Sequence, residues 1–385
     1  MVNYVFLSVY FYSVPNLRFS FEEDWCTSTI GENFRLSSGL TPSTKEKAYF
    51  NNGIIPWINS GELKNKYISF TENKLTLDAV KKHNLTIYPM DTMVIAIYGL
   101  EAAGVRGKAS ITKMDSTISQ SCMAFNSLGN VLTQFMYYVY KKEAQILGTR
   151  YAQGTKQQNL SSDLLSSYKL LYPSKEEQLK IVNFLSLIDE KIETQSKIID
   201  RLYSQIKYIK GQILNMTTIT ETKPLGQLCN ISTGKRDANE MKSNGSYKFF
   251  TCSKDDYCID TYSFDGEALI ISGNGELGLI KYYNGKFDAY QRTYVLQNFK
   301  CHPKYLMYVL QNKLPKKIEK EKNVGAMPYI VLKTLTSINI DILNMHDQIK
   351  IVNILNKFEE KLENDRILLE LFEKEKSFLL KNLFV

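Results

Sequence analysis

The residue pattern closest to a cofactor site is a glycine-rich turn. Gly273, Gly275 and Gly278 have the G-x-G-x-x-G spacing of dinucleotide-binding loops and follow an apolar run that predicts a strand. Such a loop must open a helix, because the helix N-terminus holds the pyrophosphate. Here the strand-like segment LIKYYNGKFDAY follows, with Gly285 inside it. We therefore expect a turn between two strands, not a nucleotide site.

Residues that could act as nucleophiles or metal ligands lack suitably spaced partners. Cys301 and His302 are adjacent, but nothing nearby has the pattern of an activated nucleophile. The three histidines are isolated, the six cysteines contain no C-x-x-C pair, and the nine prolines never adjoin as in an amino-methyltransferase motif. No Walker A loop occurs. We expect no catalytic residue, metal or cofactor in this chain, and reduced thiols in a cytosolic protein.

The N-terminal segment and the charge bound the class of protein. Residues 1–12 are apolar but have neither a basic leader nor a small-residue cleavage site, and they are too short to span a bilayer. We expect an extra N-terminal segment on a cytoplasmic chain without membrane contact. The net charge is +8, and residues 13–172 and 217–343 each carry an excess of four basic residues. Two modestly basic blocks suit a polyanion contacted twice.

An internal repeat organises the chain. Residues 176–193, EEQLKIVNFLSLIDEKIE, align without gaps with residues 346–363, HDQIKIVNILNKFEEKLE, at an offset of 170. Gln120 matches Gln291 at an offset of 171, and Gly39 matches Gly234 at 195, so the first block has about two dozen extra residues in its middle. We expect globular domains at 13–172 and 217–343, alternating with helices at 173–216 and 344–385, after an extra segment at 1–12.

The two predicted helices share one heptad stripe. Its steps alternate between four and three residues, which is the pattern of a coiled-coil seam. The polar break at Gln195 falls at the position equivalent to Asp365. Two narrow apolar stripes in one chain predict that the helices pair, and an antiparallel pair avoids a long return of the chain. The seam positions are Ile181, Leu185, Ile188, Ile192, Gln195, Ile199, Leu202, Ile206, Ile209, Ile213, Ile351, Leu355, Phe358, Leu362, Asp365, Leu369, Phe372, Lys376, Leu379 and Leu383.

Local signals predict how each helix begins and what the blocks contain. Ser174 with Glu177, and Asn344 with Asp347, have capping-box spacing. The runs 93–99 and 268–273 predict strands bounded by turns, and 131–147 and 303–314 predict helices. The blocks are therefore mixed α/β, and the expected fold class is α+β: two mixed α/β domains separated by a long antiparallel two-helix coiled coil, with an internal pseudo-twofold repeat.

These segments resemble Type I restriction-modification specificity subunits. YPSKEEQLKIVNFLSLIDEKIE and NMHDQIKIVNILNKFEEKLE resemble the two conserved regions of that family, which carry Gln-x-Lys-Ile-Val followed by Leu and an Asp/Glu-x-Lys-Ile. VPNLRFSFEEDW resembles its usual start, IPWINSGEL an entry strand of a target recognition domain, and LLKNLFV its usual end. The second region departs from the pattern by lacking a proline near Asn344, which affects only the local helix entry.

The resemblance implies a function and partners. It implies two target recognition domains, each recognising half of a bipartite double-stranded DNA site, and a coiled coil that carries two methyltransferase (M) subunits. S-adenosylmethionine is then bound by the M subunits, and ATP with Mg by translocating nuclease (R) subunits. None of these cofactors is expected in this chain, which is a non-catalytic subunit.

Candidate DNA-binding residues are Arg, Lys, Gln and Asn side chains in glycine-marked loops. They are Arg106, Lys108, Gln120, Arg150, Lys156, Gln157 and Gln158 in the first domain, and Lys235, Arg236, Lys254, Asn274, Lys281, Gln291 and Arg292 in the second. The alternative function is a structural coiled-coil spacer bearing two protein-binding heads.

Overall fold

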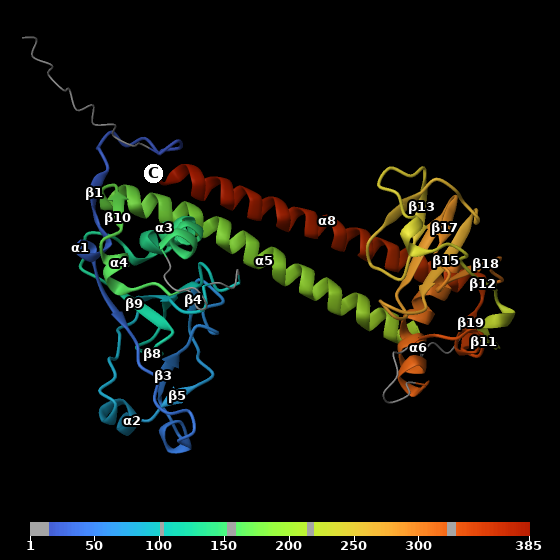
Figure 1. Cartoon of the computed structure of the whole chain (residues 1–385), viewed down its shortest axis with the longest axis horizontal. Helices are drawn as coiled ribbons and strands as arrows, with labels where there is room; N and C mark the ends of the chain where they lie inside the picture. Colours follow the sequence, from blue (N-terminus) through green and yellow to red (C-terminus); the bar gives the residue numbers. More distant parts are fainter. Residues whose placement is uncertain (1–14, 101–103, 152–158, 214–218, 322–328) are drawn as a thin grey trace, which may run out of the picture. The chain divides into compact units, whose positions relative to one another are not determined.

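A computed structural model describes residues 15–100, 104–151, 159–213, 219–321 and 329–385 (Figure 1). The chain divides into two compact units. Unit 1 is Met1–Thr194 with Leu369–Val385, and unit 2 is Gln195–Leu368. Helices α5 (Lys175–Ile213) and α8 (Met345–Leu383) contribute residues to both units. Within the described ranges, no helix is long and apolar enough to cross a membrane.

Unit 1 contains two sheets and a two-stranded ribbon. The sheet orders are β2-β9-β6-β7-β4 and β5-β3-β8, and the ribbon is β1-β10. The strands are β1 (Cys26–Thr29), β2 (Phe34–Ser38), β3 (Ile55–Ile58), β4 (Tyr67–Ile68), β5 (Lys74–Leu75), β6 (Met93–Ala96), β7 (Ala109–Thr112), β8 (Thr117–Ile118), β9 (Cys122–Ser127) and β10 (Lys169–Tyr172). The helices, besides part of α5 and α8, are α1 (Ile30–Asn33), η1 (Lys47–Tyr49), α2 (Leu77–Lys82), α3 (Thr133–Ile146), η2 (Leu147–Tyr151) and α4 (Ser162–Ser166).

Unit 2 repeats this arrangement. Its sheet orders are β12-β18-β15-β16 and β14-β13-β17, and its ribbon is β11-β19. The strands are β11 (Ile219–Pro224), β12 (Asn230–Thr233), β13 (Tyr247–Phe250), β14 (Tyr257–Ile259), β15 (Glu267–Ser272), β16 (Ile280–Asn284), β17 (Phe287–Ala289), β18 (Thr293–Gln297) and β19 (Asn339–Leu343). The helices, besides part of α5 and α8, are η3 (Leu225–Gln227), η4 (Ala238–Glu240), α6 (Pro303–Glu321) and α7 (Leu332–Thr336).

Strand order confirms that the two blocks are copies of one mixed α/β design. β2-β9-β6-β7 corresponds to β12-β18-β15-β16, and both small sheets contain one parallel pair, β3 with β8 and β13 with β17. Unit 1 adds β4 and α2 between β3 and β6, which accounts for its extra residues. The strands predicted at 93–99 and 268–273 are β6 and β15, and the helix predicted at 131–147 is α3.

One predicted helix is longer than expected. The sequence predicts a helix at 303–314, yet α6 continues to Glu321 through Pro315, which lacks a backbone donor. Leu314 is fully buried and Ile318 packs against the same core, so apolar burial on both sides of the proline outweighs its cost. The prediction was wrong at this end of the helix because tertiary packing overrides local propensity.

Repeated glycines mark close backbone approaches in both units. A Cβ at Gly39 would lie 2.0 Å from the carbonyl oxygen of Ile118, and one at Gly234 would lie 2.0 Å from that of Ala289. No larger residue fits at this separation without moving backbone. The first strand of each larger sheet therefore ends against the turn that follows β8 or β17.

The long helices contact each other within each unit. In unit 1, Ile181, Leu185 and Ile188 of α5 share a core with Leu379 and Leu383 of α8. In unit 2, Ile206 of α5 shares a core with Ile351, Leu355 and Leu362 of α8. The start of α5 thus meets the end of α8, and the end of α5 meets the start of α8 (Figure 1). Every seam residue whose side chain is described is buried or half-buried; the side chain of Ile213 lies outside the described part.

Two polar residues of the seam meet each other. Gln195 and Asp365, at equivalent positions of the repeat, are 7% and 5% exposed, and the Gln195 amide donates to the backbone oxygen of Asp365 over 3.2 Å. Lys361, one turn earlier on α8, donates to Asp365 Oδ1 over 2.7 Å. When two repeated helices run antiparallel, a residue can face its own counterpart of the repeat at only one height along the pair. In this chain the two counterparts that face each other are polar.

The two helix starts use different chemistry. Asn344 caps α8 as predicted, because its side-chain oxygen accepts the backbone N–H of Asp347 over 2.9 Å. At the start of α5 the predicted role of Glu177 is not observed. Both carboxylate oxygens of Glu177 instead accept hydrogen bonds from Arg18, at 2.9 and 2.8 Å, and the carboxylate is fully buried. A residue 159 positions away in the sequence has taken the place of a local cap.

Candidate nucleic-acid interface

Four loops of unit 2 meet at one edge of its sheets. They follow β12, β13, β15 and β17. Gly273 donates its backbone N–H to the carbonyl of Arg292 over 3.0 Å, Glu276 donates to Cys252 over 3.0 Å, and Gln291 donates to Arg236 over 3.0 Å. These backbone bonds join residues that are 19 to 55 positions apart along the chain. Six of the seven candidates predicted in the second domain lie in these loops, and the seventh, Lys281, lies on β16.

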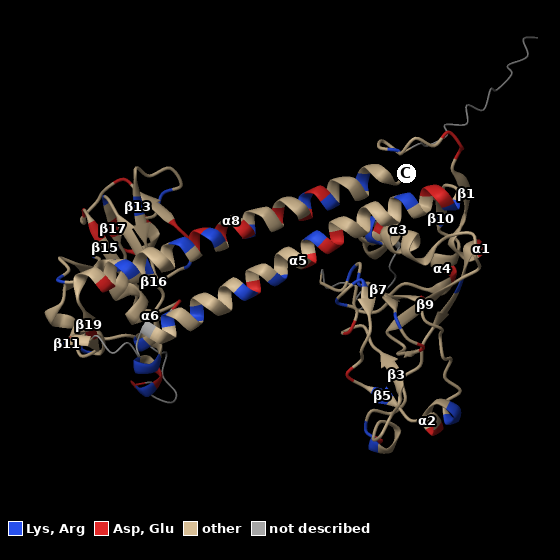
Figure 2. Ribbon diagram, turned by 180° about the vertical axis from the view of Figure 1, so that it is seen from behind, with Lys and Arg blue, Asp and Glu red and all other residues tan. Residues whose placement is uncertain are grey.

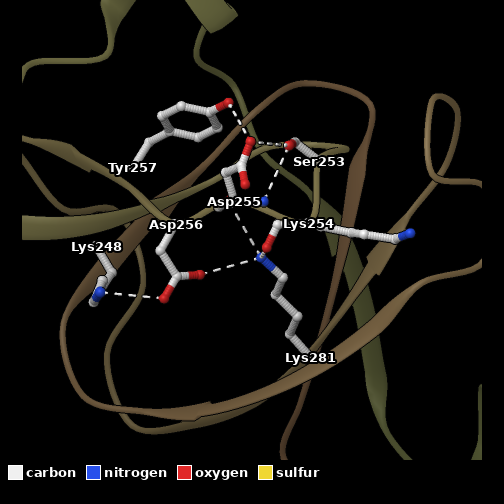
Figure 3. A network of polar contacts seen from close by, with 7 residues as sticks. All are labelled: Lys248, Ser253, Lys254, Asp255, Asp256, Tyr257 and Lys281. Atoms are coloured by element: carbon white, nitrogen blue, oxygen red, sulfur yellow. Dashed lines mark hydrogen bonds and ion pairs between the residues drawn. The ribbon is translucent and has the colours of Figure 1, made fainter. Parts of the chain in front are cut away.

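Two of these candidates already have hydrogen-bond or ion-pair partners within the domain. Arg236 Nε donates to Asp288 Oδ2 over 3.1 Å, and Asp288 is fully buried on β17. Ser263 also donates to Asp288 Oδ2, over 3.0 Å. Lys281 donates to the loop that follows β13 (Figure 3). Both cations therefore hold loops in place, which sequence spacing does not reveal.

The remaining candidates present polar groups to solvent. Lys235, Lys254, Gln291 and Arg292 are exposed, and Asn274 is half-buried. The Gln291 amide donates to Asp237 Oδ1 over 2.9 Å, so its side chain is already oriented. The edge thus combines charged ends that suit phosphates with amides that suit base edges.

Unit 1 has the same four-loop edge. Gly39 donates its N–H to the carbonyl of Cys122 over 3.2 Å, Ile97 donates to Ser121 over 3.0 Å, and Ser119 donates to Ile58 over 2.8 Å. Gln120 is exposed in the loop between β8 and β9, at the position equivalent to Gln291. The two amides that the repeat aligns therefore lie on equivalent turns of their domains.

The other candidates of the first domain are partly described. Arg106 and Lys108 lie in the loop between β6 and β7 and are half-buried. Arg106 Nε donates to the carbonyl of Leu100 over 2.6 Å, and the backbone of Lys108 bonds to Ala96 over 3.0 Å. Lys156, Gln157 and Gln158, and the side chain of Arg150, lie outside the described residues.

The G-x-G-x-x-G segment forms a turn between two strands, as predicted. It connects β15 to β16, and Gly275 and Gly278 have φ angles of 58° and 77°. A strand occupies the place of the helix that a dinucleotide site requires. Cys301 is buried, which raises the pKa of its thiol to about 11, so this sulfur stays protonated. Within the described ranges, no group of three or more metal-ligating side chains lies together.

A carboxylate in each unit joins the domain to both long helices. In unit 1, Tyr138 of α3 donates to Asp189 Oδ2 over 2.5 Å, and Lys376 Nζ of α8 lies 2.5 Å from Asp189 Oδ1. Burial first, and the nearby carboxylate second, raise the pKa of Tyr138, so its hydroxyl remains a donor. Lys66, from the extra segment of unit 1, donates to the same tyrosine over 2.8 Å.

Unit 2 repeats this junction at an offset of 170. Tyr308 of α6 donates to Glu359 Oε2 over 3.0 Å, and Lys210 Nζ of α5 lies 2.9 Å from Glu359 Oε1. Neither tyrosine was among the residues predicted from the sequence. The signal was nevertheless present, because Tyr138 and Tyr308 are identical at the offset of the repeat.

A buried glutamine at the start of each long helix is a second repeated junction. Gln178 is fully buried, and its side chain bonds to the backbone N–H of Leu132 over 2.8 Å and to the carbonyls of Pro173 and Asn130 over 2.9 and 3.2 Å. Gln348 bonds to the backbone N–H of His302 over 2.8 Å and to the carbonyl of Leu343 over 2.7 Å. Each amide links the start of a long helix to the start of the domain helix.

The sequence of this chain is similar to those of known specificity subunits. The Type I restriction modification DNA specificity domain model matches residues 22–203 and 220–372. The Type I restriction enzyme EcoDI specificity subunit of Escherichia coli is 35% identical over 150 residues, which are 39% of this chain and 33% of that protein. The MjaIX specificity subunit of Methanocaldococcus jannaschii is 32% identical over 182 residues, which are 46% of this chain and 40% of that protein.

Solved structures share the fold over almost the whole chain. The S subunit of a Type I restriction-modification system from M. genitalium has a TM-score of 0.66 and 19% identity, over 97% of this chain and 99% of the other. A chain from a study of complex assembly and conformational transition in the Type I system has a TM-score of 0.57 and 12% identity, over 94% of this chain and 97% of the other. With two matched specificity domains, this chain belongs to the Type I restriction-modification DNA specificity family.

Proposed function

We propose that this chain is the sequence-recognition subunit of a Type I restriction-modification complex. Each of its two domains recognises one half of a bipartite double-stranded DNA target. The observation that carries the proposal is the four-loop edge present in both units, with Gln120 and Gln291 on equivalent turns. Two copies of one recognition edge in a single chain suit two half-sites, and the two equal cationic excesses suit two contacts with one polyanion.

Recognition at each edge is divided between phosphate and base contacts. Exposed cations such as Lys235, Lys254 and Arg292 hold a domain on the duplex through phosphates. Amides such as Gln120, Gln291 and Asn274 distinguish base edges, since Gln and Asn form paired hydrogen bonds with adenine in the major groove. The candidates Arg106 and Lys108 remain part of this proposal for the first domain.

In the same proposal, α5 and α8 form an antiparallel coiled coil that sets the distance between the half-sites. Both helices have 39 residues, and their stripes are buried against each other in each unit. Two recognition domains on one face of B-DNA must bind major grooves that are separated by about 34 Å, one helical turn, or by a multiple of this distance. Inserting or deleting one turn in 195–210 should therefore change the spacer and leave both half-sites unaltered. Methylome sequencing that finds an unchanged spacer would exclude this role.

The outer faces of the long helices are proposed to bind two methyltransferase (M) subunits. Acidic and basic residues are interspersed along both helices (Figure 2), and large apolar side chains are exposed among them, including Leu187, Tyr208, Leu371 and Phe378. Exposed apolar residues on a charged helix are typical of partner surfaces. S-adenosylmethionine belongs to the M subunits in this proposal, and ATP with Mg belongs to translocating nuclease (R) subunits.

The salt dependence of DNA binding tests the proposed function. A subunit that contacts phosphates with several cations should lose affinity steeply between 50 and 200 mM salt, because each neutralised phosphate releases counterions. With its cognate M subunits it should direct methylation to one two-part motif. The alternative, a spacer with two protein-binding heads, predicts negligible DNA affinity at any salt concentration and no motif.

A further inference from the structure

The loop that follows β13 in unit 2 has an internal hydrogen-bond network (Figure 3). Ser253 Oγ accepts the backbone N–H of Asp255 over 3.1 Å, and Tyr257 donates its hydroxyl to Asp255 Oδ2 over 3.5 Å. This loop is also bonded to the next loop, since Glu276 donates its N–H to the carbonyl of Cys252. The backbone of the loop is therefore held at several points.

Lys281 supplies the main anchor of this loop from the neighbouring strand β16. Its ammonium donates to the carbonyl oxygens of Lys254 and Asp255 over 2.8 and 3.3 Å, and to Asp256 Oδ1 over 3.1 Å. The other oxygen of Asp256 accepts from Lys248 over 3.2 Å. An ammonium group has three N–H donors, and these three acceptors use all of them. Lys281 has no donor left for a phosphate or a base.

Lys254 has the opposite arrangement. Its carbonyl is held by Lys281, while its side chain is 74% exposed and its Nζ lies 3.5 Å from Glu276 Oε2. An exposed pair at this distance contributes little to stability, and salt screens it. A phosphate can therefore replace Glu276 as the partner of Lys254 at small cost.

We infer that Lys281 and Asp256 are positioning residues that clamp the β13–β14 loop, and that Lys254 is the cation of this loop that contacts the DNA backbone. The inference rests on the proposed function and divides its candidate residues by role. Loss of the clamp should broaden base recognition in one half-site, whereas loss of Lys254 should weaken binding to all sequences alike.

The test uses the full chain with its cognate methyltransferase and a duplex carrying the motif found by methylome sequencing. Binding of matched, singly mismatched and unrelated duplexes is measured between 50 and 200 mM salt for Lys254→Met, Lys281→Met and Asp256→Asn. Lys300→Met, an exposed lysine after β18 at the far end of that strand, is the matched control. Lys254→Met should reduce the slope of log affinity against log salt by about 0.9, and equally for all duplexes.

The clamp variants should behave differently from Lys254→Met. Lys281→Met and Asp256→Asn should each lower discrimination against a mismatch in one half-site by about 10-fold and leave the other half-site unchanged. Asp256→Asn is the sharper variant, because it removes a negative charge and would strengthen binding if only charge mattered. In the Lys281→Met, Asp256→Asn double variant the loss should equal that of one single variant, since both remove the same clamp.

Several results would overturn the inference. Lys281 contacts DNA directly if Lys281→Met reduces the salt slope as Lys254→Met does, with discrimination unchanged in Asp256→Asn. Additive losses in the double variant would also exclude a shared clamp. If the unmodified chain binds no duplex at low salt, the proposed function fails and the inference fails with it. If it binds with a steep salt slope and the variants do not divide as described, only the clamp is wrong.

Discussion

The repeated buried glutamines allow a quantitative prediction about how each domain is joined to its long helix. Replacing Gln178 by Leu keeps the volume of the side chain close to its original value and removes three hydrogen bonds to the backbone. Replacing Gln348 by Leu removes two. Each lost bond leaves a backbone donor or acceptor without that partner beside a side chain that is at most 2% exposed.

The magnitude follows from the number of bonds. At about 1 kcal/mol for each neutral hydrogen bond, Gln178→Leu should destabilise the junction between the starts of α5 and α3 by about 3 kcal/mol, and Gln348→Leu should destabilise the junction between the starts of α8 and α6 by about 2 kcal/mol. These values correspond to local amide exchange rates that are about 150-fold and about 30-fold higher, if the intrinsic exchange rate of each amide is unchanged. Each effect should appear in the unit that contains the substitution.

Hydrogen exchange read out by mass spectrometry resolves the two units within one chain. Gln205→Leu on the exposed face of α5 is the matched control, and it should alter local stability by less than about 0.5 kcal/mol. The prediction is contradicted if the amide exchange rates of both variants match those of the control. It is also contradicted if Gln348→Leu increases exchange more than Gln178→Leu does. Either result would mean that these amides do not hold the domain helices.

Two further predictions concern single contacts. The double variant Gln195→Leu, Asp365→Leu should raise the midpoint of thermal unfolding, because it replaces a buried polar pair whose Asp365 Oδ2 has no hydrogen-bond partner among the described residues. Without this pair the helices should lose their single register, so that engineered cysteine pairs along α5 and α8 cross-link in more than one register. A lower midpoint together with a single cross-linked register would contradict this prediction. For Asp341, burial would raise the pKa, but hydrogen bonds from Lys313 and Thr222 outweigh it and lower the pKa below its ordinary value. Its ionised form therefore stabilises the fold above about pH 4 and loses that contribution as the pH falls through the lowered pKa. Asp341→Asn should cost more stability in urea unfolding at pH 7 than at pH 3. An equal cost at both values would exclude the contact as its source.

Periodicity in the sequence was sufficient for the long helices and for the repeat. The heptad stripe predicted two helices, and the structure has them at Lys175–Ile213 and Met345–Leu383. Apolar runs predicted β6 and β15 because a buried strand needs consecutive apolar residues. Both kinds of pattern depend on residues that are close in the sequence, so they can be found without knowing the fold.

The roles of individual charged residues depended on contacts that the sequence does not encode locally. Arg236 and Lys281 were predicted as DNA contacts, but Asp288 and Asp256 form ion pairs with them from 52 and 25 positions away. Glu177 has capping-box spacing, yet Arg18 binds its carboxylate. Which partner a charged side chain finds is decided by strand pairing and burial over long sequence separations.

The chain's order of elements, its duplication and the polar level shared by Gln195 and Asp365 can all be derived from spacing, because helical and strand periods are properties of neighbouring residues. The way in which sheets form from strands far apart in the sequence decides which loops lie together at one edge. It also decides which cations at that edge are held by carboxylates of the same domain. That closure depends on three-dimensional packing, and for this reason the sequence alone does not show which loops form the proposed recognition edge.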